Sequence, residues 1–143
     1  MTFVLDATAL MDFFSEVRAA DEVSAIVEEH DCIVPVVNLA EAADKTARAE
    51  DVSVDDLRKF AGSKMAGLIE VVPVGADHAW RAAELRSRHY HARRSPLSLA
   101  DCFLLAVAEP GDTIVTADRA VARAARTEGI EVAGLPDGAG RRP

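Results

Sequence analysis

Four acidic residues occupy positions from which their side chains could act together on a phosphate substrate. Asp6 and Asp118 each follow a short apolar run, and Glu41 and Asp101 each lie in the expected first turn of a helix. Four carboxylates that converge repel one another, so such a group persists when a cation neutralises it. Carboxylate oxygens prefer Mg²⁺ or Mn²⁺. A metal held there could activate a water and orient a phosphodiester, so the four acids are candidate catalytic residues and metal ligands.

A structural explanation also exists for each acid taken alone. Aspartate and glutamate are favoured in the first turn of a helix, where they accept hydrogen bonds and suit the helix dipole. Asn38-Leu-Ala-Glu41 and Ser98-Leu-Ala-Asp101 both fit the capping-box pattern. Capping does not explain why Asp6 interrupts an apolar stretch, nor why four such acids each precede an apolar helix in one small domain.

The elements that must position these acids alternate between short apolar runs and helical patterns. The pattern predicts strands at 2–5, 32–34, 68–74, 113–116 and 130–132, and helices at about 7–17, 22–29, 38–50, from 53 onward, 76–91, 98–109 and 118–128. This alternation predicts an α/β three-layer sandwich with a central, mainly parallel sheet of about five strands. Three of the acids then follow strand carboxyl ends, where parallel sheets bind ligands. Asp101 joins them only if its helix begins at the same edge.

The composition suits one packed domain. The chain has 143 residues, of which 50% are hydrophobic, and we expect residues 1–136 to form a single domain and residues 137–143 a flexible tail. It has no apolar run of 18 residues and no basic leader, so we expect a cytoplasmic protein without a membrane span. Cys32 and Cys102 are expected to be buried free thiols.

The acids occur in four segments in a fixed order: residues 3–10 (FVLDATAL), 38–41 (NLAE), 97–106 (LSLADCFLLA) and 114–119 (IVTADR). Together these segments resemble the PIN-domain ribonucleases, and in particular the VapC-type toxins of prokaryotic toxin–antitoxin pairs. The third segment is the most specific of the four. The resemblance extends over residues 3 to 132, nearly the whole chain.

The resemblance implies a PIN-like fold and an endoribonuclease, a hydrolase that depends on Mg²⁺ or Mn²⁺ and acts as a toxin. It assigns metal ligation or water activation to the four acids, Asp6, Glu41, Asp101 and Asp118. It also implies that Thr116 and Thr8 orient the acids or waters. A homodimer and a cognate antitoxin that occludes the site are implied as partners.

The net charge of −8 repels RNA over most of the surface, so a local basic region is needed. Between residues 81 and 94 the chain holds five arginines and one glutamate. We expect Arg88, Arg93 and Arg94 to contact RNA phosphates, which would position the strand without reading its sequence. A solvated helix face is the alternative explanation.

Two other functions are compatible with this topology. An aspartate-based phosphatase would use Asp6 as nucleophile, but haloacid-dehalogenase-like enzymes need a second acid two residues later, where this chain has Thr8. Alternatively, the chain could be a non-catalytic antitoxin- or RNA-binding module. The intact set of four acids argues against that alternative.

Overall fold

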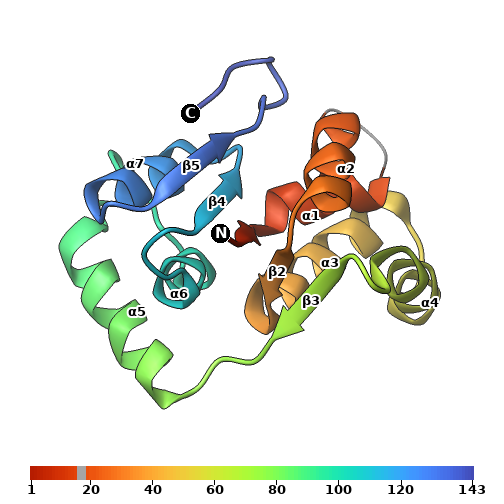
Figure 1. Ribbon diagram of the computed structural model, residues 1–143, viewed down its shortest axis with the longest axis horizontal. Coiled ribbons are helices and arrows are strands. Elements are labelled where there is room, and N and C mark those ends of the chain that lie inside the picture. The colour runs from red at the N-terminus through yellow and green to blue at the C-terminus, as the bar shows by residue number, and fades with distance from the viewer. Residues whose placement is uncertain (16–18) are drawn as a thin grey trace.

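A computed structural model describes residues 1–15 and 19–143 and shows one all-parallel sheet between two layers of helices (Figure 1). The strand order is β3–β2–β1–β4–β5. The strands are β1 (Phe3–Leu5), β2 (Cys32–Pro35), β3 (Ile69–Val72), β4 (Thr113–Thr116) and β5 (Glu131–Gly134). The predicted α/β fold class with a parallel sheet of about five strands is confirmed.

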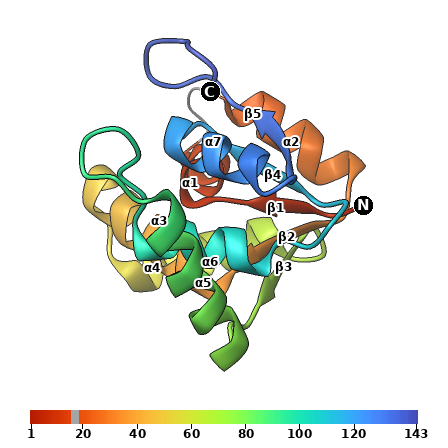
Figure 2. The same ribbon diagram turned by 90° about the vertical axis from the view of Figure 1, so that its left-hand side faces the viewer.

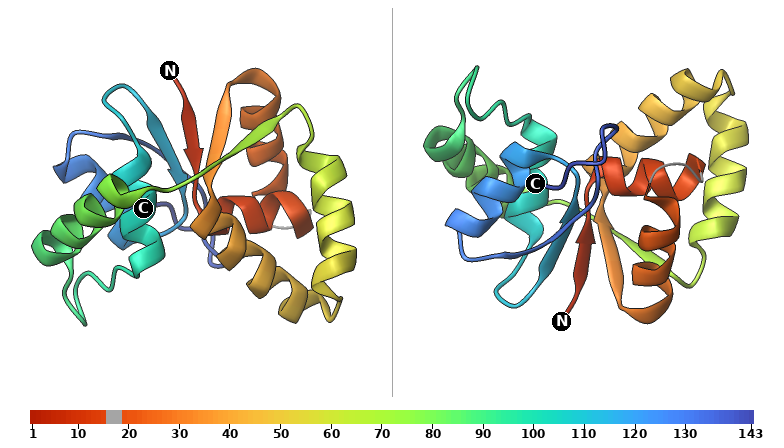
Figure 3. Two further views of the ribbon diagram at one scale, coloured as in Figure 1. Left: turned by 90° about the horizontal axis from the view of Figure 1, so that it is seen from below. Right: turned by 90° about the horizontal axis from the view of Figure 1, so that it is seen from above.

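Seven helices in the described part of the chain cover the two faces of the sheet. One face packs against α1 (Ala7–Ser15), α2 (Ala20–Glu29), α3 (Val36–Glu50) and α4 (Val54–Met65). The other face packs against α5 (Ala76–His89), α6 (Leu99–Val107) and α7 (Arg119–Thr127). Figures 1 and 3 show the two groups of helices on opposite sides of the strands.

Both faces of the central strands are buried, which is why these strands read as continuous apolar runs. Successive side chains of a strand point to opposite faces. Leu5 and Val115 therefore enter the core beneath α1 to α4. Val4 and Ile114 enter the core beneath α5 to α7. All four are 0% exposed, so β1 and β4 form the centre of the molecule.

The strand order places a topological switch point between β1 and β4. From β1 the chain adds β2 and β3 on one side, whereas β4 and β5 lie on the other. In open parallel sheets ligands bind at the carboxyl ends of the strands at such a point. Asp6 follows β1, and Thr116 is the last residue of β4. The fold thus brings two distant segments to the edge at which sheets of this kind bind ligands.

The start of α3 differs from the expectation. Asn38 was expected to cap this helix, but the helix begins at Val36 and its N-cap is Pro35, with φ −64° and ψ 141°. Proline fixes φ and has no N–H, so it fits the residue just before a helix without losing a hydrogen bond. Asn38 therefore lies inside the first turn, and Glu41 lies one turn later than predicted. The prediction that Asn38 and Glu41 form a capping box is therefore wrong.

Other boundaries shift by a few residues. α1 is described to Ser15, and the expected end of its helix near Val17 lies outside the described residues. β5 begins at Glu131 and extends to Gly134, later than expected. Cys32 and Cys102 are buried free thiols, as predicted. None of the described helices is long and apolar enough to span a membrane.

The last residues fold back onto the molecule. Arg142 pairs with Glu22 of α2 through both of its terminal nitrogens, at 2.8 and 2.9 Å, and donates to the carbonyl of Gly134. Arg126 of α7 donates to the carbonyl oxygen of Pro143 at 3.2 Å. The division into a domain of residues 1–136 and a flexible tail of residues 137–143 stays a prediction.

Replacing Leu105 by alanine should lower the free energy of unfolding by about 2–5 kcal/mol, because it leaves a cavity between α6 and the sheet. Leu105 is 0% exposed. Leu99→Ala on the same helix is the control, because Leu99 is 58% exposed and its loss should cost only about 0.5 kcal/mol. Urea denaturation measures both variants. Equal losses would contradict the assignment of Leu105 to the core.

Candidate active site

Asp6 is a buried carboxylate fixed by three hydrogen bonds. It follows β1 and is 3% exposed. Its Oδ1 accepts hydrogen bonds from the Thr8 hydroxyl at 2.7 Å and from the Ala9 amide at 2.8 Å. Its Oδ2 accepts one from the hydroxyl of Thr116, at the end of β4. The Thr116 oxygen in turn accepts a hydrogen bond from the Asp118 amide at 2.9 Å. The two threonines thus hold Asp6 and link it to the segment that carries Asp118.

Burial governs the proton affinity of Asp6. Removal from water raises its pKa from 3.8 to about 6, although the hydrogen bonds from Thr116, Ala9 and Thr8 favour the ionised form. The negative charge of Asp101 raises the pKa further. Asp6 is therefore a carboxylate whose ionised form gains from a nearby cation.

Asp118 and Asp101 both cap helices, and Oδ2 of Asp118 has no hydrogen bond among the described residues. Oδ1 of Asp118, the N-cap of α7, accepts hydrogen bonds from the Ala120 and Val121 amides at 2.7 and 3.0 Å. Asp101 forms a capping box with Ser98, whose amide donates to Oδ2 at 2.8 Å. The Asp101 carboxylate also interacts with the Ser98 side chain, so its hydrogen bonds stay within the capping box. Capping and ligation are therefore compatible in both residues.

The helix start that carries Asp101 does lie at the edge where the other acids are found. Burial raises the pKa of Asp101, against the lowering by its hydrogen bonds with Ser98. The charges of Asp118 and Glu41 raise the same pKa, and Asp101 raises that of Asp6. Asp101 therefore interacts electrostatically with the three other acids.

Glu41 lies on the solvent side of this group. It is on α3, and its carboxylate pairs with Lys45 one turn later on the same helix. Its side chain is 24% exposed. Lys45 thus places one positive charge beside the Glu41 carboxylate.

Asn38 connects the two helices that carry Glu41 and Asp101, a role that the sequence reasoning missed. Its side chain is 0% exposed, and its Nδ2 donates to the carbonyl of Ala100 at 3.3 Å. Its Oδ1 is buried without a hydrogen-bond partner. The contact joins the first turn of α3 to the first turn of α6. A polar residue in an apolar run was the available signal, but the chain alone does not reveal its partner 62 positions away.

The donor atoms, although not their spacing, suit a hard divalent cation. They are carboxylate oxygens, and Asp6 and Asp101 have raised pKa values that a positive charge would reverse. No group of three His, Cys, Asp or Glu residues among the described residues is gathered closely enough to hold a metal ion. The acids thus stand within electrostatic reach of one another, short of a closed coordination shell.

The three arginines expected to contact RNA have different surroundings. Arg88 is paired with Glu128 of the α7 end at 3.0 Å, so its charge is already compensated. Arg93 and Arg94 are exposed in the loop between α5 and α6, where their amides donate to His91 Nδ1. Figure 2 shows this loop on the side toward which the strands run. Their contact with RNA stays a prediction.

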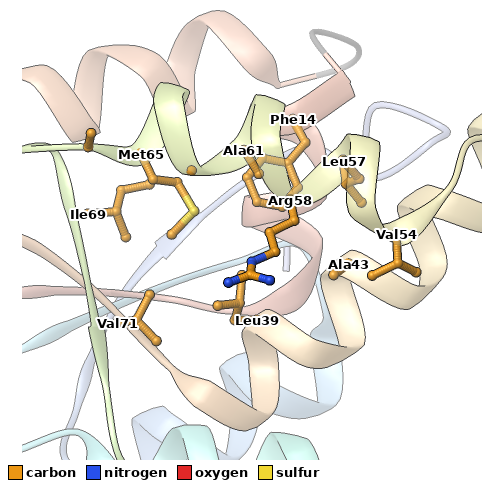
Figure 4. A pocket seen from close by; sticks show the side chains of 12 residues that line it. Phe14, Leu39, Ala43, Val54, Leu57, Arg58, Ala61, Met65, Ile69 and Val71 are labelled. Carbon is orange, nitrogen blue, oxygen red and sulfur yellow. The ribbon is translucent and has the colours of Figure 1, made fainter.

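An apolar groove of about 390 Å³ lies elsewhere, between α3, α4 and β3. Figure 4 shows Met65, Ile69 and Val71 along it and the Arg58 side chain crossing it beside Leu39. No carboxylate lines this groove. It suits apolar side chains rather than a phosphodiester, so it is not part of the candidate active site.

The fold and this site together define a class of protein. Residues 3–127 match the PIN domain, so the chain belongs to the PIN-domain family. The predicted resemblance to that family is confirmed. No curated protein matches the sequence.

Solved structures of toxin–antitoxin proteins share the fold. VapBC2 from Rickettsia felis, bound to a promoter DNA fragment, has a TM-score of 0.63 at 11% identity, covering 93% of this chain and 98% of that one. VapC20 from Mycobacterium tuberculosis, a toxin that cleaves the sarcin–ricin loop, has a TM-score of 0.63 at 16% identity, covering 95% and 90%. DNA-bound VapBC from Salmonella typhimurium has a TM-score of 0.63 at 18% identity, covering 93% and 97%.

The burial of Asp6 gives a prediction for stability without metal. The folded state holds the Asp6 proton up to about pH 6, whereas the unfolded chain releases it near pH 3.8. Stability is therefore lost as the pH rises between about 4 and 6. Asp6→Asn removes this loss, so in EDTA at pH 7.5 the variant should be more stable than the parent by roughly 2–3 kcal/mol.

Urea denaturation at pH 7.5 and pH 4 measures the effect, which should shrink toward zero at pH 4. Asp55→Asn serves as control, because the Asp55 side chain is 68% exposed. The comparison is the difference in stability between Asp6→Asn and the parent at each pH. If this difference favours the variant less at pH 7.5 than at pH 4, the explanation from the buried charge of Asp6 is refuted.

Proposed function

We propose that this protein is a metal-dependent endoribonuclease that hydrolyses RNA phosphodiester bonds. The observation that carries the proposal is the coupling of Asp101 with Asp6, Asp118 and Glu41 at the switch-point edge of a PIN-domain fold. Groups of carboxylates that raise one another's pKa are typical of functional sites rather than of caps alone.

The residues have distinct parts in the proposed reaction. Asp6, Asp101, Asp118 and Glu41 would hold Mg²⁺ or Mn²⁺. When bound, such an ion supplies water activation and charge stabilisation at the leaving oxygen. Thr116 and Thr8 fix the Asp6 carboxylate through their hydroxyls, so both of its oxygens keep one orientation. The capping bonds do the same for Asp118 and Asp101.

The proposed biological role is that of a toxin. It is supported by the shared fold with VapBC2 from Rickettsia felis and with VapC20 from Mycobacterium tuberculosis. A cognate antitoxin is the proposed protein partner, and the proposed functional form is a cytoplasmic homodimer. The acidic net charge of −8 suits a basic segment of an antitoxin entering the site.

The phosphatase alternative loses its chemical basis. A nucleophilic aspartate must reach the phosphorus atom, but Asp6 is 3% exposed. Both of its oxygens already accept hydrogen bonds from Thr8, Ala9 and Thr116. This environment suits a fixed ligand better than an attacking group.

Cleavage of a mixed RNA pool tests the proposal. Purified protein, freed of any co-purifying partner, should cut RNA with Mg²⁺ or Mn²⁺ and not with EDTA. Asp101→Asn should reduce cleavage by about a hundredfold or more, because it removes a ligand charge from the centre of the group. Asp55→Asn, which neutralises an exposed aspartate on α4, should cleave as the parent does.

Thermal unfolding with and without Mn²⁺ accompanies the assay. Bound metal should raise the melting temperature of the parent and of Asp55→Asn, and raise that of Asp101→Asn less, because ligands that bind the native state stabilise it. Cleavage that persists in EDTA, or that Asp101→Asn retains at the parental level, would refute the proposed site.

A further inference from the structure

The outer face of α7 carries three arginines. Arg119, Arg123 and Arg126 are spaced by four and three residues, which places them on one side of a helix. They span about 10 Å at a rise of about 1.5 Å per residue. The opposite side of α7 is buried against the sheet through Ala120, Val121, Ala124 and Ala125. This arginine face is therefore a fixed feature of the packed helix.

A groove of about 510 Å³ runs along this face. It is lined by Arg119, Arg123, Arg126, Thr127, Arg142 and Pro143. Arg142 and Pro143, at the C-terminal end of the chain, line the other side of the groove. Figure 3 shows this end of the chain close to α7. The side chains that line it include four arginines and no aspartate or glutamate.

Two of the α7 arginines, Arg119 and Arg123, have no acidic partner among the described residues. Arg123 donates to the carbonyl oxygen of Arg94 at 3.0 Å, which holds the guanidinium group in place without cancelling its charge. Arg126 donates to the main-chain oxygen of Pro143, the last described residue, at 3.2 Å. In the described part of the chain, the Arg119 side chain has no hydrogen bond or ion pair. Arg142 is the exception in the groove, since it pairs with Glu22.

The arginine face begins at the candidate active site. Arg119 directly follows Asp118. The bond from Arg123 to the Arg94 carbonyl ties the face to the loop that leads into Ser98 and Asp101. A strand lying in the groove would therefore extend from the acids along α7.

We propose that the arginine face of α7 is the track that binds the phosphates of single-stranded RNA and leads the strand to the acids. The inference rests on the proposed function for the identity of the polyanion. Guanidinium groups recognise phosphates through charge and planar hydrogen bonding, without reading bases. In a chain of net charge −8, this local reversal is what lets a polyanion approach.

The test measures RNA binding in EDTA, so no cleavage is needed. A fluorescein-labelled 16-nucleotide RNA of mixed sequence is titrated with protein at several KCl concentrations, followed by anisotropy. The variant R119Q/R123Q/R126Q should bind about tenfold more weakly at low salt. The slope of log K against log salt should be flatter by about 2, since each lost phosphate contact on a single strand removes about 0.7.

A matched control removes the same charge elsewhere. R48Q/R58Q/K59Q changes three exposed basic residues on α3 and α4. It should bind RNA within about twofold of the parent and keep the parental slope. Equal weakening in both triple variants would show that overall charge alone governs binding, and would overturn the track.

Two further variants keep the inference testable if the triple variant unfolds. R119Q, whose side chain makes no described contact, should flatten the slope by about 0.7. R119K/R123K/R126K retains the charges and should retain the parental slope. An unchanged slope in R119Q would overturn the track.

The outcomes separate this inference from the proposed function. Metal-dependent cleavage together with unchanged RNA binding in folded R119Q/R123Q/R126Q would overturn the track and leave the nuclease intact. Weakened RNA binding in a protein that never cleaves would support the track and refute the nuclease. If the variants lose binding to a poly-glutamate peptide but not to RNA, the face is a protein-docking surface and the inference is wrong.

Discussion

The buried carboxylate of Asp6 is the constraint on which the site depends. A charge in this position is unfavourable unless hydrogen bonds or a cation compensate for it. The compensation within the chain comes from Thr8 and Ala9 on one side and from Thr116 on the other. Because Thr116 ends β4 and Asp6 follows β1, the same bonds that hold the charge also fix the strand pair at the centre of the sheet.

The helix starts of α6 and α7 combine an observed structural role with a proposed chemical one. Asp101 and Asp118 each use one oxygen to bind backbone amides at a helix N-terminus. A carboxylate has a second oxygen, and that of Asp118 has no hydrogen bond among the described residues. Capping, which is observed, and the proposed ligation can therefore involve the same residues. This double use lets a small domain present several acids without dedicated supporting elements.

Most of the fold was predictable because each core strand is an apolar run and each helix has apolar residues at helical spacing. Val4, Leu5, Ile114 and Val115 all face the interior, so no alternation obscured β1 or β4. The start of α3 was missed because Pro35 both ends β2 and caps the helix. In the sequence alone, Asn38 fits the capping pattern equally well. The order of the acids was visible, whereas the convergence of Asp101 depended on the contact of Asn38 with Ala100.

The basic surface shows where sequence reasoning stops. The density of arginines before residue 95 suggested a phosphate patch, but Arg88 meets Glu128, which is 40 positions away. The spacing of Arg119, Arg123 and Arg126 was readable as a helix face. The position of Arg142 beside this face could not be read from the sequence, because it requires the chain end to return to α2 and α7.

The bond between Thr116 and Asp6 joins residues 110 positions apart. Pairing of that separation forms late, because a long loop must close before the contact stabilises it. During synthesis on the ribosome, β1 and the first helices emerge while β4 and α7 are still untranslated. A nascent chain, or a product truncated before residue 118, therefore lacks an assembled set of acids. The order of the elements in the sequence thus delays any activity of this site until Asp118 and α7 have been translated.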